Sequence, residues 1–333
     1  MPMYELLGIS LVLTALLTIN AGTSALAAGV WRLLERPLRR CAASTRAEIV
    51  FALRVGPPAV AIIAIAAFLV PSYLTYEPYR SGEFVGNKLA ALALLSGVGI
   101  ALALWRGIHS WLATRSLLRE WLSIASAFTI SQIDIPTFRL PHSFPIIAVV
   151  GTVRPRLFIA ERVLESLSEE ELIAAIAHEC GHVAARDNLK RLLIRACRDM
   201  LSIVPCGRAI DRAWAENAEA AADEHAAERG SAVALNLASA LIEIARMVPA
   251  GARPTMPAAV FILGDDDHGV MGRVNRLIAL AGTSRQRVSR RFFYWAERLA
   301  FLVLLAGLLI AVTNTQVLAS LHLAIERIVE ILS

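Results

Sequence analysis

The chain has 333 residues, a formal net charge of +5 and a hydrophobic content of 56%. That content exceeds the roughly 45–50% of apolar residues in soluble domains, which argues against a purely soluble protein. The positive charge does not predict a nucleic-acid partner, because the arginines flank apolar blocks and no nucleic-acid-binding motif is visible.

Three apolar blocks in residues 1–113 are long enough to span a bilayer, which takes about 20 residues. The first block lacks the basic segment and the cleavage site of a signal peptide, so we expect it to be a retained span. The three predicted spans cover about residues 6–31, 55–74 and 89–113.

The placement of arginine and lysine predicts the orientation, because these residues concentrate on the cytoplasmic side of a membrane. The expected loop 32–48 carries five arginines, whereas residues 75–88 carry only Arg80 and Lys88 as basic residues. We therefore expect a multi-pass protein of the cell (inner) membrane. Its N-terminus would lie outside and residues 114–291 would form a cytoplasmic domain.

Two β-type runs, 145–151 and 156–160, predict a hairpin in this domain. An exposed edge of the hairpin would suit an extended peptide beside the next helix. A hairpin that only covers the helix fits the sequence equally well.

A helix is predicted over about residues 169–186, since apolar residues recur there at helical spacing. Ser168 and Glu171 have the spacing of a capping box, in which each side chain bonds the backbone amide of the other. The helix should therefore begin directly after Ser168.

This helix carries the pattern His178-Glu179-Cys180-Gly181-His182. The two histidines lie on one helix face and can bind one metal ion. Glu179 lies about 100° around the helix, at the edge of that site. Its carboxylate can take a proton from a water molecule activated by the metal. The pattern predicts Zn²⁺ as cofactor, His178 and His182 as ligands and Glu179 as the general base.

A second helix, over about 211–229, is rich in alanine and would pack closely on the first. It offers Glu219 as the third metal ligand. Asp223 follows one turn later on the same face, where it can accept the N–H of a ligating histidine. We keep His225 as a candidate hydrogen-bond donor to the transition state.

The chain continues with a Gly-, Pro- and Asp-rich loop and a basic helix within 251–290. A fourth apolar block predicts a span at 292–316, and residues 317–333 predict a short amphipathic tail, so the C-terminus would lie on the outer side of the membrane. We therefore expect a mainly α, four-span protein with a zinc domain at 114–291.

Residues 144–226 resemble the BlaR/MecR-type antirepressor metallopeptidases, which are integral membrane zinc enzymes. The resemblance implies a zincin-like (gluzincin) domain with a small β-hairpin or sheet, zinc on His178, His182 and Glu219, and Glu179 as base. The matching elements are Phe144-Pro145, Arg154-Pro155-Arg156, Leu167 to Leu172, the two-histidine pattern, Arg186-Asp187-Asn188, Pro205, and Glu219 with Asp223.

Sensor members of that family continue beyond the last span into an extracellular penicillin-binding domain, whereas this sequence ends at Ser333. We therefore expect the signal to come from a separate sensor protein or through the spans. The predicted function is a membrane-embedded zinc endopeptidase that cleaves a cytoplasmic regulator, such as a transcriptional repressor.

Two alternatives stay open. Ala222-Asp223 is similar to HtpX-type membrane quality-control proteases, but these place two spans after the zinc helix, where residues 188–204 are strongly charged. The other alternative is a non-catalytic, zinc-stabilised membrane receptor or scaffold. Glu179 argues against it, because a structural metal site needs no base.

Overall fold

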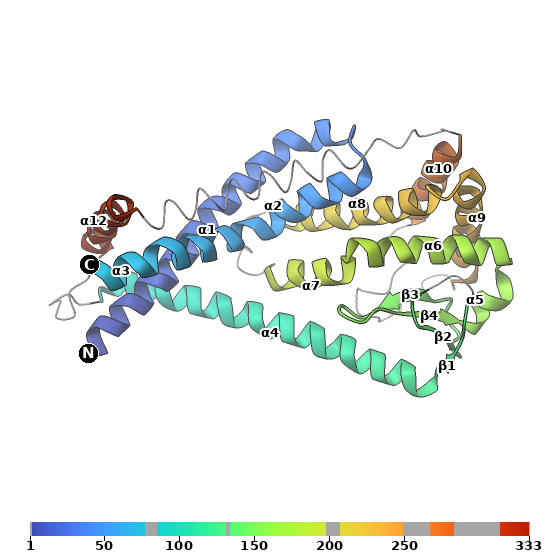
Figure 1. The fold of residues 1–333 in the computed structure, drawn as a ribbon, viewed down its shortest axis with the longest axis horizontal. Coiled ribbons are helices and arrows are strands. Elements are labelled where there is room, and N and C mark those ends of the chain that lie inside the picture. Colours follow the sequence, from blue (N-terminus) through green and yellow to red (C-terminus); the bar gives the residue numbers. More distant parts are fainter. Residues whose placement is uncertain are drawn as a thin grey trace.

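The computed structural model describes residues 2–76, 85–130, 134–197, 207–248, 267–282 and 314–332 (Figure 1). Residues 251–266 of the predicted loop, and almost all of the fourth span at 292–316, lie outside the described residues, whereas Asp267 to Gly269, also predicted as loop, begin a helix. The end of the chain, predicted as an amphipathic tail, forms helix α12 (Thr315–Leu332).

Long helices make up the first third of the protein. Three stretches, Tyr4–Leu38, Ala43–Tyr76 and Asn87–Ile124, are long and apolar enough to cross a membrane, and each contains one predicted span. The orientation and a fourth span stay predictions. The helices are α1 (Pro2–Leu38), α2 (Ala43–Ala64), which continues through a π-helical turn at Ile65–Leu69 into α3 (Val70–Tyr76), and α4 (Asn87–Ile124).

The basic segment 32–48 is not the loop that the sequence suggested. It is helical except for residues 39–42, because α1 ends at Leu38 and α2 begins at Ala43. Arginine and leucine are good helix formers, so the helices extend past the apolar blocks. α4 likewise continues beyond residue 113 and reaches the sheet (Figure 1).

The predicted hairpin is confirmed as part of a larger mixed sheet with the strand order β1-β2-β4-β3. β3 pairs antiparallel with β4, whereas β2 pairs parallel with β4 and antiparallel with β1. The sequence did not predict β1 or β2. The strands are β1 (Ser126–Ala127), β2 (Thr137–Leu140), β3 (Ile147–Val150) and β4 (Arg156–Ala160).

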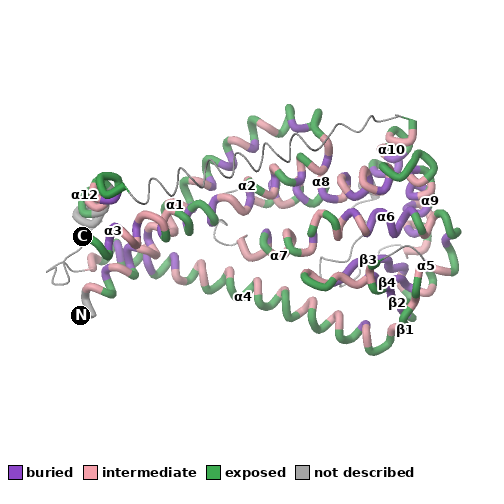
Figure 2. Tube along the Cα trace, in the orientation of Figure 1, coloured by how far each residue is buried: buried purple, intermediate pink, exposed green. Residues whose placement is uncertain are grey.

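Helices cover this sheet and form the core with it. The largest buried cluster joins the strands to α6, α9 and Trp121 at the end of α4. Figure 2 shows buried residues gathered along α6 and the strands, whereas much of α4 is exposed. The helices after the sheet are α5 (Glu161–Ser166), α6 (Glu169–Ala185), α7 (Asp187–Cys197), α8 (Gly207–Ala227), α9 (Ser231–Met247) and α10 (Asp267–Ala281).

Candidate metal centre

The capping box that the sequence predicted fixes the start of α6. The Ser168 hydroxyl accepts the Glu171 amide at 3.3 Å, and the Glu171 carboxylate accepts the Ser168 amide at 2.9 Å. The helix ends at Arg186, which has a left-handed backbone with φ of 55°. Both histidines of the two-histidine pattern therefore lie in one continuous helix.

Three candidate ligands come together between α6 and α8. His178, His182 and Glu219 each offer one ligand atom, and these atoms lie within 4.8 Å of one another. His178 Nε2 lies 3.5 Å from Glu219 Oε2, and His182 Nε2 lies 3.5 Å from Glu219 Oε1. Two ligands at zinc-ligand distance from a tetrahedral ion are about 3.4 Å apart. The donor set fits zinc, and both distances from Glu219 match this spacing.

A carboxylate stands behind each histidine. Asp223 Oδ1 lies 3.0 Å from His178 Nδ1, and Asp187 Oδ2 lies 2.7 Å from His182 Nδ1. A carboxylate on Nδ1 favours the tautomer whose Nε2 is free to bind a metal. The contact expected for Asp223 is present, and Asp187 supplies a second contact of the same kind.

Asp187 had not been assigned this role from the sequence. The left-handed turn at Arg186 ends α6, and α7 begins with Asp187, so the chain folds back and brings this carboxylate to His182. The polar segment Arg186-Asp187-Asn188, which begins one turn after the second histidine, is the sequence signal for it.

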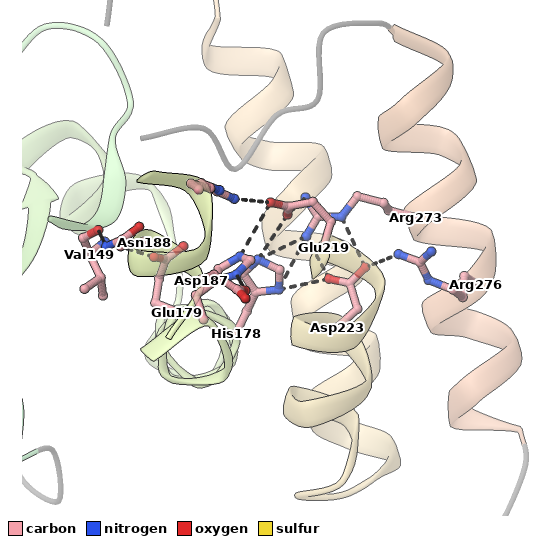
Figure 3. A network of polar contacts seen from close by, with 11 residues as sticks. Val149, His178, Glu179, Asp187, Asn188, Glu219, Asp223, Arg273 and Arg276 are labelled. Atoms are coloured by element: carbon pink, nitrogen blue, oxygen red, sulfur yellow. Dashed lines mark hydrogen bonds and ion pairs between the residues drawn. The ribbon is translucent and has the colours of Figure 1, made fainter. Parts of the chain in front are cut away.

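Glu179 is buried and contacts the sheet. Its Oε2 accepts the backbone amide of Val149 in β3 at 3.0 Å (Figure 3). The Asn188 side chain donates to the carbonyls of Val149 and Gly151 at 3.0 and 3.1 Å. The outer edge of β3 is therefore bonded to α6 and α7 at Val149. At Val149 the structure therefore favours the hairpin that covers the helix over the exposed edge for a peptide.

Two arginines of α10 reach the same site from the opposite side (Figure 3). Arg273 is buried, and its guanidinium lies 3.2 Å from Glu219 Oε2 and 2.7 Å from Asp223 Oδ1. Arg276 also pairs with Asp223. From the sequence, this segment was predicted only as a basic helix. Its long-range pairing with α8 has no local signal, because 50 residues separate Arg273 from Asp223.

The charges of these groups stabilise one another. Burial lowers the pKa of His182, but the negative charge of Glu219 and the hydrogen bond to Asp187 raise it to about 10. Burial raises the pKa of Glu219, but the charge of His182 and the hydrogen bond from His178 hold it well below its usual range. Burial also raises the pKa of Asp223, but the charge of Arg273 and the hydrogen bond from His178 together hold this pKa below its usual range. Both carboxylates therefore carry their charge at neutral pH.

α6 and α8 pack closely beside the ligands, as the alanine-rich sequence suggested. A Cβ atom added at Gly181 would lie 3.0 Å from Ala222 Cα and 3.2 Å from His225 Cβ. His225 thus sits against Gly181, about 9 Å along the axis of α8 from Glu219. Its role as a transition-state donor stays a prediction.

The sequence of the domain that contains this site was compared with those of known proteins. Residues 148–301 match the family model of Peptidase family M48. The match supports a zinc metallopeptidase of that family, and it contains every site residue from Val149 to Arg276. The narrower BlaR/MecR resemblance stays a prediction. No curated protein matches the chain.

Proposed function

We propose that this protein is a membrane-embedded, zinc-dependent endopeptidase with His178, His182 and Glu219 as metal ligands. The observation that carries the proposal is the convergence of these three side chains, within 4.8 Å, beside the carboxylate of Glu179. The match of residues 148–301 to Peptidase family M48 supports the same reaction.

When bound, zinc supplies a Lewis acid that polarises the peptide carbonyl and acidifies water. Glu179 acts as general base and takes a proton from the attacking water, then delivers it to the leaving amine. The amide of Val149 holds its carboxylate in place at 3.0 Å. Asp187 and Asp223 fix the orientation of the two imidazoles, and Arg273 compensates the charge of Glu219 and Asp223.

We further propose that the catalytic domain is cytoplasmic, with the N- and C-termini outside the inner membrane, and that the substrate is a cytoplasmic regulator such as a transcriptional repressor. The arginine-rich inner segments and the resemblance to antirepressor metallopeptidases support this assignment. The signal would come from a separate sensor protein or through the spans. The HtpX-type alternative predicts many damaged membrane proteins as substrates instead.

A survey of new protein N-termini in cells with wild type or Glu179→Gln, with and without cell-wall stress, tests these proposals. Glu179→Gln removes the base and keeps the metal ligands, so zinc content serves as the control. One or two cleaved cytoplasmic regulators support the signalling role. Many cleaved membrane proteins support quality control. Identical N-termini with normal zinc content would contradict proteolysis and favour the non-catalytic receptor.

A further inference from the structure

A cavity of about 280 Å³ lies between α4, α7 and the turn that joins β3 to β4. Figure 1 shows α7 running between α2 and α4, with the hairpin approaching from the sheet. This volume is close to the lower end of small-molecule pockets, roughly 300–1,000 Å³. The space suits a headgroup-sized ligand.

The cavity wall is strongly basic. Four arginines line it, and no acidic residue is among its described lining residues. The arginines come from all three walls: Arg115 from α4, Arg154 from the turn, and Arg191 and Arg195 from α7. Such a ring selects an anion, since guanidinium groups bind phosphate and carboxylate with paired hydrogen bonds.

Contacts with other side chains of the protein hold three of these arginines in place. The Arg115 guanidinium stacks over Trp111 at 5.3 Å, and Arg195 donates to the Ser110 hydroxyl at 3.0 Å. Arg191 pairs with Glu219 at 3.3 Å. The cavity therefore adjoins the candidate metal centre.

The apolar part of the wall consists mainly of Trp111, Leu118 and Leu192. On the same stretch of α4, apolar side chains are exposed: Trp105, Ile108, Trp111 and Leu112 are 60%, 56%, 45% and 46% exposed. A ligand with both a charged and an apolar part matches this combination.

The position of the cavity along α4 restricts the class of ligand further. α4 is apolar up to Trp105 and basic from Arg106 onward. Ser110 and Arg115 lie about 6 and 14 Å beyond Arg106 along the helix axis. The headgroup region adds roughly 5–8 Å to each side of the hydrocarbon. α4 therefore places Ser110 in the headgroup region if the hydrocarbon ends at Trp105, and Arg115 there if the hydrocarbon ends at residue 113.

We propose that this cavity binds the phosphate headgroup of an anionic phospholipid. The guanidinium groups bind the phosphate, and the acyl chains follow the exposed apolar face of α4. Arg119 offers a control position, because it is an exposed arginine one turn beyond Arg115 that does not line the cavity. The lipid site does not depend on the proposed peptidase activity.

An acidic peptide is the competing ligand, and the structure favours it less. The neighbouring edge of β3, along which a peptide would extend toward the cavity, is bonded to Glu179 and Asn188 at Val149. On α4, by contrast, Trp105 and Ile108, which precede the cavity residue Ser110, are exposed.

Native mass spectrometry of the full-length protein in neutral detergent tests the site, with phosphatidylglycerol or phosphatidylcholine added. Wild type should retain phosphatidylglycerol about tenfold more tightly than phosphatidylcholine, which is about 1.4 kcal/mol. The double variant Arg115→Gln/Arg195→Gln should bind phosphatidylglycerol about tenfold more weakly, whereas the matched control Arg119→Gln should bind it as wild type does. Thr114→Glu, which adds a negative charge to the wall, should weaken binding in the same direction.

Zinc content and helical circular dichroism show whether each variant is folded. Equal retention of phosphatidylglycerol by wild type, the double variant and Thr114→Glu would overturn the proposal. Displacement of the lipid by inorganic phosphate at equal concentration would show a free-anion site, and displacement by a short glutamate peptide would show a peptide site. Either displacement would overturn the lipid assignment.

Discussion

Two helix contacts in this protein differ in the size of the side chains between the helices. α6 and α8 meet through Gly181 and Ala222, where even a methyl group would lie 3.0 Å from the opposite backbone. α4 and α7 carry arginine, tryptophan and leucine side chains that line a cavity of about 280 Å³. The short side chains let ligands from two helices converge on one ion. The long ones leave room for a larger ligand.

The two contacts also differ in charge. At the candidate metal centre, the carboxylates of Glu219 and Asp223 contact imidazole and also pair with Arg273 and Arg276. Between α4 and α7, the cavity lining contains only basic charges among its described residues. A site that combines carboxylates with imidazoles suits a cation that displaces protons from histidine, whereas a site lined by guanidinium groups suits an anion.

The largest expected effect is the loss of the ligand that α8 contributes. Glu219→Gln should remove zinc and lower peptide cleavage by roughly a thousandfold or more, because the Lewis acid is lost. Metal analysis and cleavage assays measure both. Glu216→Gln, at an exposed position one turn earlier on α8, is the matched control and should change neither. Normal zinc content in Glu219→Gln would contradict the ligand set.

Arg54 connects α2 to one helix of each of the two contacts, α8 and α7. It is buried in α2, pairs with Asp211 of α8 at 2.6 Å and donates to the carbonyl of Cys197 at the end of α7. Arg54→Leu should lower the free energy of unfolding by roughly 3–5 kcal/mol, because it leaves a carboxylate without its buried partner.

Denaturation in detergent measures this loss. Arg139→Leu is the control, since Arg139 and Glu161 form a pair whose side chains are 44% and 39% exposed. It should cost at most about 1 kcal/mol. Equal losses of unfolding free energy in the two variants would show that the buried Arg54 contributes no more to stability than the exposed Arg139.

The contact of Asp187 with His182 should affect metal affinity more than folding. Asp187→Asn should weaken zinc binding by roughly 10–100-fold, because the amide no longer fixes the imidazole as a carboxylate does. Competition with a zinc chelator measures the affinity. Glu170→Gln, at an exposed position in the first turn of α6, should leave it unchanged. An unchanged affinity in Asp187→Asn would mean that the contact is not needed for the ligand.

The smallest expected effects come from adding one methyl group, by a glycine-to-alanine substitution, at each of the two helix contacts. Gly181→Ala should destabilise the protein by roughly 1–3 kcal/mol, because α8 must move away from α6. Gly107→Ala should be neutral or stabilising by roughly 0.5–1 kcal/mol, since its new Cβ would meet only Ala196 Cβ at 3.7 Å. Thermal unfolding of both variants measures the difference. A destabilising Gly107→Ala would contradict the looser packing of α4 on α7.

The features that could be predicted from the sequence are those that local sequence patterns determine. The capping box of Ser168 and Glu171, the helix that carries both histidines, and the hairpin formed by β3 and β4 are present in the structure. The convergence of Glu219 with the histidines followed from one face of an alanine-rich helix. These features depend on helix and strand periodicity.

The rest depends on contacts between distant segments. The contact of Asp187 needs the left-handed turn at Arg186, and Arg273 reaches Asp223 from a helix that lies 50 residues further along the chain. The cavity needs α4 to continue as a helix beyond residue 113, where the sequence pattern suggested only the end of a span. None of these contacts leaves a periodic signal in the sequence.

Zinc-edge X-ray absorption spectroscopy of the purified protein tests the central claim most directly. We expect one zinc ion per chain, bound by two imidazole nitrogens and carboxylate oxygen, with an exchangeable water and no sulfur. Burial raises the pKa of the Cys180 thiol, which disfavours it as a ligand. Glu179→Gln should give the same spectrum without cleaving peptides. A sulfur ligand, or a closed site with four protein ligands, would contradict a catalytic centre at His178, His182 and Glu219.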